Sequence, residues 1–170
     1  MSVLAALSTP AFPVAVLACV LVALVGGFLT ETGPWYHALR MPSWRPPRWA
    51  FGPAWTAIFA CIALAATLAW NDAPDAKART ILIGLLAANA LLNMAWSGIF
   101  FKWRRPDLAF HELVLLWFSI LSLVAFTREF SAAASNLLLP YLAWVAFAGV
   151  LNHRIVVMNA PFPAAVREGL

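Results

Sequence analysis

The chain has 170 residues, of which 64% are hydrophobic and only 11% are charged, and its mean hydropathy is +0.84. A composition this apolar excludes a water-soluble globule and a large catalytic domain outside a membrane, and the length allows one domain. The net charge of +4 comes from basic residues spread over short segments, so the chain has no Lys/Arg tract that could follow a nucleic-acid backbone.

Five runs of about 20 nearly uncharged residues, the length that crosses a bilayer as a helix, dominate the chain. In hydrocarbon the backbone must satisfy its own hydrogen bonds, and continuous apolar runs without alternation favour helices over barrel strands. The predicted fold is therefore all-α, an integral membrane bundle of five transmembrane helices that forms a single domain over residues 1–170. The predicted spans are 12–29, 51–70, 81–101, 108–126 and 137–158.

The segment 30–50, between the first two spans, is long for so short a chain and contains Pro34, Pro42, Pro46 and Pro47. Proline fixes φ and removes an N–H donor, so this segment cannot be a regular helix throughout. The same restriction lowers the entropic cost of holding the segment as a lid over the mouth of the bundle. We predict that its aromatic residues bind a ligand from this lid; they are Trp35, Tyr36, Trp44 and Trp49.

The chain has nine tryptophans, far above ordinary usage, and their positions divide them into groups. Trp70 and Trp103 lie at span ends, where amphipathic indole rings commonly form an interfacial belt. Another group lies well inside the spans, where each indole N–H needs a partner or a cavity. Its members are either pocket walls or packed core residues: Trp55, Trp96, Trp117 and Trp144.

Polar amides inside the spans are candidate ligand contacts. Asn89 and Asn93 are four residues apart in the third span, and Trp96 follows on nearly the same helix face. Amides in hydrocarbon need partners, so these side chains either hydrogen bond to other helices or bind the polar rim of a ligand. Asn152, which lies on roughly the same face of the fifth span as Trp144, has the same two interpretations.

Glu112, next to His111, is the only carboxylate inside a predicted span. A charge in hydrocarbon is costly and by default faces the interior at a functional site, although near a helix start it can instead reach the membrane interface. His111 and His153, one on each of two spans, are weak evidence for haem ligation, and no metal site is predicted. Cys19 and Cys61 lie in apolar runs and are predicted to be small buried hydrophobes.

Basic residues are distributed unevenly between the two sides of the predicted bundle. Eight fall on one side: Arg40, Arg45, Arg48, Lys102, Arg104, Arg105, Arg154 and Arg167. Three fall on the other: Lys77, Arg79 and Arg128. Because cytoplasmic loops carry the excess of Lys and Arg, this bias predicts a cytoplasmic C-terminus and an N-terminus outside, with a bacterial inner membrane as the default location.

Gly84 and Ala88 form a small-xxx-small pair on the third span. Such a pair lets two helix backbones approach closely, so it predicts a homodimer through this helix. Pairs of this kind also occur by chance in Ala-rich spans.

Several motifs together carry a specific resemblance. The first loop reads WY-xx-L-xx-P-x-W-x-PP from Trp35 to Pro47, and the third span reads N-xxx-N-xx-W followed by FF. The fourth span has an early acidic residue at Glu112, and the fifth contains PY-xx-W and LN. Over nearly all of its length the chain therefore resembles the translocator protein family, also called the tryptophan-rich sensory protein (TspO/MBR) or peripheral benzodiazepine receptor family.

The resemblance implies a five-helix bundle, usually dimeric in bacterial members, with a pocket beneath the first loop. Family ligands are protoporphyrin IX, haem, benzodiazepine-type and isoquinoline drugs and, in animals, cholesterol. The family's porphyrin-reactive tryptophans correspond to Trp55 and Trp144, and its pocket amides to Asn89 and Asn93. The sterol-recognition pattern of animal members is incomplete here, because His153 stands where that pattern requires a tyrosine.

The leading hypothesis is a receptor or regulator in the lipid bilayer that binds porphyrin or haem and influences tetrapyrrole homeostasis or stress signalling, with no obligatory cofactor. Porphyrin propionates would meet Arg40, Arg45 and Arg48 near the mouth. The alternatives are a photo-oxidative enzyme that degrades porphyrin through Trp55 and Trp144, and a transporter of porphyrin or sterol. The sequence has no nucleophile–base set or nucleotide motif, which weighs against a conventional enzyme. It also has no inverted repeat, which weighs against a transporter.

Overall fold

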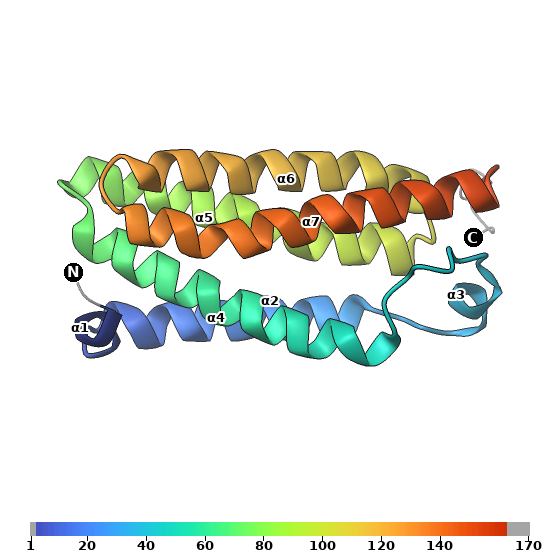
Figure 1. The fold of residues 1–170 in the computed structure, drawn as a ribbon, viewed down its shortest axis with the longest axis horizontal. Helices are drawn as coiled ribbons and strands as arrows, with labels where there is room; N and C mark the ends of the chain where they lie inside the picture. Colours follow the sequence, from blue (N-terminus) through green and yellow to red (C-terminus); the bar gives the residue numbers. More distant parts are fainter. Residues whose placement is uncertain (1–2, 163–170) are drawn as a thin grey trace, which may run out of the picture.

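The structure is a computed structural model that describes residues 3–162, and every regular element in them is a helix (Figure 1). The long helices are α2 (Ala11–Leu29), α4 (Arg48–Asp72), α5 (Ala76–Ser97), α6 (Pro106–Arg128) and α7 (Ala132–Asn159). The short elements are α1 (Val3–Leu7), α3 (Pro34–Ala38) and the π-helical turn η1 (Gly98–Lys102), which continues α5. Five helices are long and apolar enough to cross a membrane, which confirms the predicted all-α bundle and makes this an integral membrane protein.

The helices contain the predicted spans and extend beyond most of their ends, because capping residues and charged terminal turns escape a hydropathy criterion. Helix α5 begins at Ala76, where the Asp75 carboxylate caps it by accepting a hydrogen bond of 2.7 Å from the Ala78 N–H. Helix α4 begins directly after Pro47, whose backbone is extended. Basic residues that the sequence assigned to loops, such as Arg48, therefore lie in the terminal turns of helices.

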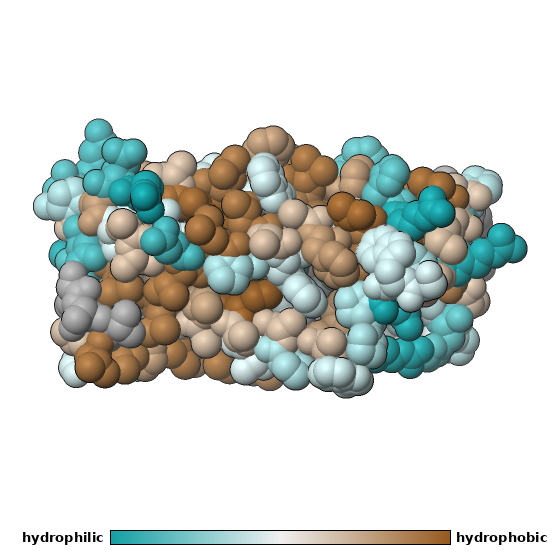
Figure 2. All heavy atoms as spheres, viewed as in Figure 1, coloured by the Kyte–Doolittle hydropathy of each residue, from teal (hydrophilic) through white to brown (hydrophobic). Residues whose placement is uncertain are grey.

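The long helices run along the long axis of the molecule (Figure 1). Helix α6 packs against α5 and α7, α4 packs against α7, and α2 packs against α4 and α5. Helix α1 lies at one end of the bundle, and α3 lies at the other end near the end of α7; we call the latter the loop end (Figure 1). On the face shown in Figure 2, apolar residues dominate the middle and hydrophilic residues gather toward both ends, as a bilayer requires.

Helix α2 differs from the other long helices because none of its residues is buried. The three hydrophobic clusters of the core draw their buried members from the other elements, α1 and η1 included. Toward α1 the core contains Leu68 and Leu123, and in the middle it contains Ile120 and Tyr141. At the loop end its buried residues are Phe100, Phe101, Ala109, Leu151 and Ile155. Helix α2 is therefore a wall placed against a core that the other helices complete.

The segment between α2 and α4 folds back onto the loop end. The Tyr36 ring lies 5.6 Å from the Phe101 ring between centroids, within the cluster of buried side chains there. The Arg40 N–H donates to Asn159 Oδ1 over 2.8 Å, and Asn159 Nδ2 donates to the Arg40 carbonyl over 2.9 Å. This reciprocal pair fixes the middle of the segment to the last residue of α7.

Candidate functional site

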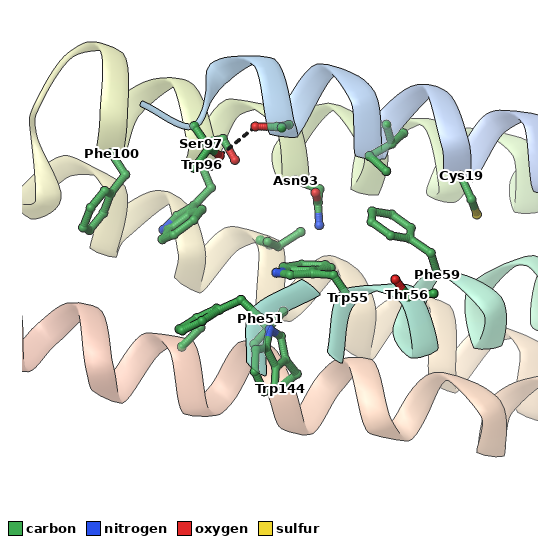
Figure 3. A pocket seen from close by; sticks show the side chains of 18 of the residues that line it. Cys19, Phe51, Trp55, Thr56, Phe59, Asn93, Trp96, Ser97, Phe100 and Trp144 are labelled. Carbon is green, nitrogen blue, oxygen red and sulfur yellow. Dashed lines mark hydrogen bonds between the residues drawn. The ribbon is translucent and has the colours of Figure 1, made fainter. Parts of the chain in front are cut away.

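A cavity of about 940 Å³ lies between α2, α4, α5 and α7 and reaches the segment between α2 and α4 (Figure 3). Most side chains that line it are apolar or aromatic. Few polar side chains enter it, and these include Asn93, Ser97, Thr56 and the arginines at the loop end. This combination of an apolar interior with a few placed polar groups is typical of small-molecule sites.

Aromatic rings from several helices form much of the wall of the cavity (Figure 3). Helix α4 contributes Phe51, Trp55 and Phe59, whose spacing of four residues puts them on one helix face. The Trp55 and Phe59 rings lie 5.4 Å apart between centroids, and Trp144 of α7 lies 5.8 Å from Phe51. Trp96 and Phe100 extend the aromatic surface along α5 and η1. A flat ligand would therefore meet indole and phenyl faces on several sides.

The two asparagines of α5 have different positions. Asn93 lines the cavity and donates from Nδ2 to the Tyr141 hydroxyl over 2.9 Å. Asn89 is buried and outside the lining; its Oδ1 accepts from the Tyr141 hydroxyl over 3.3 Å, and its Nδ2 donates to Ser119 Oγ over 2.8 Å. These bonds connect α5, α6 and α7. The sequence left two interpretations open, hydrogen bonding between helices and contact with a ligand. Asn89 fits the first, whereas Asn93 bonds to another helix and also lines the cavity.

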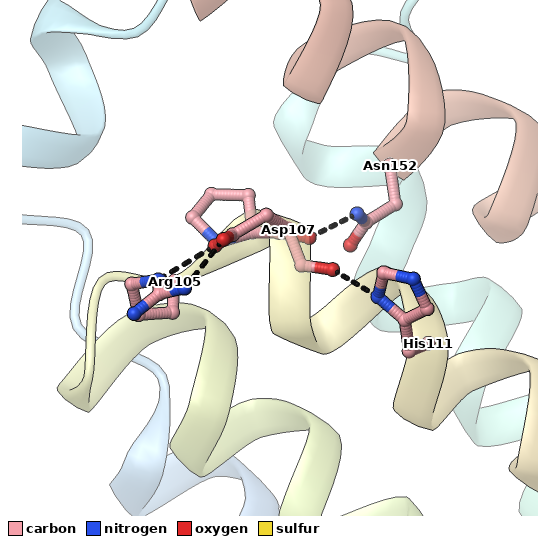
Figure 4. A network of polar contacts seen from close by, with 5 residues as sticks. Arg105, Asp107, His111 and Asn152 are labelled. Carbon is pink, nitrogen blue, oxygen red and sulfur yellow. Dashed lines mark hydrogen bonds and ion pairs between the residues drawn. The ribbon is translucent and has the colours of Figure 1, made fainter. Parts of the chain in front are cut away.

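Asn152 lines the cavity from α7 and also holds α7 to the start of α6, because its Nδ2 donates to the Pro106 carbonyl over 2.7 Å (Figure 4). Next to this contact, Arg105 forms two hydrogen bonds of 2.8 and 2.6 Å with the Asp107 carboxylate. The His111 Nδ1 lies 2.9 Å from the Asp107 carbonyl oxygen. The hydrogen bonds to Asp107 raise the pKa of the Arg105 guanidinium. This network orders the turn between η1 and α6.

Glu112 is 8% exposed on α6 and does not line the cavity. Within the described residues neither of its carboxylate oxygens has a hydrogen-bond partner, and the same holds for Trp96 Nε1 and Asn152 Oδ1. These atoms are also fully buried, so they do not face the open space of the cavity. The predicted role of Glu112 in ligand binding has no direct geometric support, and its side chain faces the interior of the bundle.

The segment between α2 and α4 contributes Tyr36 and Arg45 to the lining, and Arg48 lines the cavity from the first turn of α4. Arg48 Nη2 lies 2.7 Å from His37 Nδ1. The tryptophans predicted to act from this lid do not line the cavity. Trp35 packs against Phe100, Trp44 packs against Phe147, and Trp49, in the first turn of α4, is 75% exposed.

Other candidates lie elsewhere. Trp117 and His153 line a smaller groove of about 380 Å³ between α6 and α7. Gly84 and Ala88 are exposed on α5 and do not line the cavity. In residues 3–162 the His, Cys, Asp and Glu side chains form no group of three that could hold a metal ion.

Sequence reasoning missed the contribution of α2 to the site. Cavity residues of this helix include Cys19, Val20, Ala23 and Gly26. Helix α2 is apolar on every face, so neither a polar residue nor an amphipathic pattern marks the side that faces the cavity. In the sequence of α2, only the adjacent glycines Gly26 and Gly27 could have indicated a contribution to the cavity.

Comparisons with known proteins agree with this architecture. A model described as "TspO/MBR family" matches residues 15–158. A "Tryptophan-rich protein TspO" from Chlorobaculum tepidum is 39% identical over 83% of this chain and 90% of its own. A "Translocator protein" from Ovis aries is 36% identical over 76% of this chain and 81% of its own. "Protein CrtK" from Rhodobacter capsulatus is 28% identical over 90% of this chain and 95% of its own.

Proposed function

This chain belongs to the TspO/MBR family, and from that premise we propose that it is a membrane receptor for porphyrins such as protoporphyrin IX or haem. The ligand occupies the cavity between α2, α4, α5 and α7. Its binding affects tetrapyrrole homeostasis or stress signalling. The observation that carries the proposal is one cavity that combines aromatic walls with two arginines at the loop end.

The dimensions and walls of the cavity suit a flat macrocycle. Its volume of about 940 Å³ lies within the roughly 300–1,000 Å³ of typical ligand sites. Indole rings offer large apolar faces with favourable stacking geometry, and Trp55, Trp96 and Trp144 all line the cavity. Asn93 supplies an amide at the side of the same space.

The arginines provide a charge match for the propionates. Arg45 and Arg48 line the cavity, and hydrogen bonds between guanidinium and carboxylate are among the stronger ones in proteins. Arg40 is outside the lining, with its backbone bonded to Asn159. We therefore assign the propionates to Arg45 and Arg48.

The proposal extends to orientation and assembly. The charge bias supports an orientation with the loop end and the C-terminus in the cytoplasm of a bacterial cell and with the protein in the inner membrane. One of the eight basic residues behind that bias, Arg167, lies outside the described residues. The exposed pair Gly84 and Ala88 supports a homodimer through α5, because a Cβ at Gly84 would meet no atom within 4 Å beyond its chain neighbours and its own helix backbone.

Titration of the purified protein with protoporphyrin IX tests the function. We expect saturable, stoichiometric quenching of tryptophan fluorescence. The double variant Arg45→Gln, Arg48→Gln should bind protoporphyrin IX more weakly and should bind its dimethyl ester, which has no propionate charge, as well as the unchanged protein does. Quenching that does not saturate would contradict the proposed porphyrin binding. If the double variant binds the acid and the dimethyl ester equally more weakly, the arginines do not bind the propionates.

A further inference from the structure

Different neighbours hold the two ends of α2. Just before its start, Thr9 Oγ1 accepts a hydrogen bond of 3.1 Å from Asn71 Nδ2 at the end of α4. At the loop end the neighbour is η1, because Lys102 Nζ lies 5.5 Å from the Phe28 ring centroid and pairs with Glu31. A side chain at Gly26 would also lie 3.8 Å from Ser97 Oγ of α5. Helix α2 thus begins beside α4 and ends beside α5 and η1.

The first half of α4 is held on the opposite side. Phe51 contacts Trp144 of α7 with ring centroids 5.8 Å apart, and Trp55 contacts Tyr141 of α7 at 6.2 Å. Helices α2 and α4 therefore separate toward the loop end, each following a different neighbour. The cavity occupies the space that this separation leaves, with Cys19 of α2 and Phe59 of α4 on facing sides (Figure 3).

The gap between α2 and α4 has two outer edges, one on each helix. The residues along these edges are exposed and also line the cavity. On α4 the edge consists of Thr56 and Ala60. On α2 it consists of Val16, Val20, Ala23 and Gly27. A side chain at Gly27 would have no neighbouring atom within 4 Å, and Val20 is 46% exposed. The edge therefore consists of small and β-branched residues, none of which is buried, and these leave the cavity unsealed along this line.

The edge lies deep within the membrane-spanning part of both helices. The Thr9–Asn71 contact joins the turn before α2 to the end of α4, and these two helices run antiparallel (Figure 1). Val20 and Ala60 are equally far along the chain from this contact. They therefore lie at similar depth, roughly 16 Å from that contact at 1.5 Å per residue. The middle of a hydrocarbon layer about 30 Å thick lies at a comparable depth. An opening at this depth would face lipid tails and not water.

We infer that the cavity opens sideways into the hydrocarbon of the membrane between α2 and α4, and that its ligands enter from the lipid. The ligand class is therefore a hydrophobic molecule already dissolved in the bilayer. Arg45 and Arg48 meet its polar groups only after its apolar body has passed the edge. The identity of the ligand rests on the proposed function, whereas the opening rests on the geometry of α2 and α4.

The kinetics of protoporphyrin IX binding in proteoliposomes test the route. Phenylalanine at Ala23 or Ala60 narrows the opening, and ligand crosses the same barrier in both directions. We expect Ala23→Phe and Ala60→Phe each to slow association and dissociation by about tenfold. The matched controls are Ala18→Phe and Ala57→Phe, on the same helices, exposed and outside the lining; they should leave both rates unchanged.

The dissociation rate separates a narrowed opening from a filled cavity. A phenylalanine that merely occupies binding space would speed dissociation, whereas a blocked route slows it. Unchanged or faster dissociation in Ala23→Phe and Ala60→Phe would show that ligand uses the loop-end mouth, and the inference would be wrong.

A second measurement does not require porphyrin binding. Phosphatidylcholine with a diazirine in the middle of one acyl chain is photolysed in proteoliposomes, and the adducts are mapped by mass spectrometry. An open edge predicts adducts on the cavity-facing Cys19 and Phe59, lost in Ala60→Phe. Adducts confined to residues outside the lining would overturn the opening. If adducts form in the cavity of a protein whose fluorescence porphyrin does not quench saturably, the lateral opening is supported. Only the proposed ligand is then wrong.

Discussion

At the scale of single residues, position within the bundle separates tryptophans that composition alone cannot distinguish. Trp55 and Trp144 line the cavity, Trp117 lines an outer groove, and Trp49 and Trp103 are largely exposed. The exposed rings are placed to anchor the protein in the membrane interface. Rings at the cavity instead offer stacking surfaces to a ligand, and their indole groups can be oxidised.

Phenylalanine at Trp55 or Trp144 separates stacking from chemistry. Either change keeps much of the apolar contact, and aromatic pairs contribute about 0.5–1.5 kcal/mol beyond burial, so porphyrin affinity should fall by about tenfold or less. Any light-driven conversion of porphyrin should fall much further, as followed by absorbance under illumination in air. Trp117→Phe is the control for a tryptophan outside the cavity. Undiminished conversion in the Trp55→Phe, Trp144→Phe double variant would exclude a chemical role for the pair.

Alanine at Asn89 and at Asn93 should give different defects. Loss of Asn89 removes the acceptor of the buried Tyr141 hydroxyl and a donor to Ser119, so thermal unfolding in detergent should show a loss of about 1–2 kcal/mol. Loss of Asn93 leaves the Tyr141–Asn89 bond in place, so it should lower porphyrin affinity more than stability. The reverse pattern would show that Asn89 contacts ligand and that Asn93 serves the fold.

At the scale of elements, the apolar runs were sufficient to predict the five long helices, because a backbone in hydrocarbon has few other solutions. Their ends were less predictable. The start of α5 depends on the Asp75 cap, and the short helix α3 depends on packing against the loop end. For the site, tryptophans and asparagines marked α4, α5 and α7. Helix α2 carries no such marker, so its contribution to the cavity could not be predicted from the sequence and is seen only in the structure.

The segment between α2 and α4 should depend on Asn159, which bonds to both backbone groups of Arg40. Asn159→Ala leaves these groups to water and releases the segment, so trypsin should cleave after Arg40 more rapidly. Asn136→Ala is a matched control, because Asn136 bonds to Arg128 at the other end of the bundle. Equal cleavage rates in both variants would show that the aromatic contacts of Tyr36 and Trp35 suffice to hold the segment.

At the scale of the whole molecule, charge and surface shape predict how the bundle sits and associates. Alkaline phosphatase is active only outside the cytoplasm, so a fusion at the C-terminus should be inactive and a fusion in the turn between α4 and α5 should be active. An active C-terminal fusion would reverse the orientation and place the arginines of the cavity on the outer side of the membrane.

Dimerisation through α5 predicts a defined mutational pattern. Gly84→Leu introduces a side chain where close backbone approach is required, and it should shift the protein toward monomer in chemical cross-linking and light scattering. Ala125→Leu, at an exposed position of α6, should leave the oligomeric state unchanged. An unaltered dimer in Gly84→Leu would exclude this face of α5 as the interface.

Helix α2, which has no buried residue, also bears on how proteins of this architecture diversify. Substitutions in a helix outside the core cost little folding stability, because the surrounding packing does not depend on its side chains. Yet residues such as Val20 and Ala23 line the cavity. Selection can therefore reshape ligand preference by altering α2 while the other four long helices preserve the fold. A lineage could exchange one ligand for another without passing through an unstable intermediate.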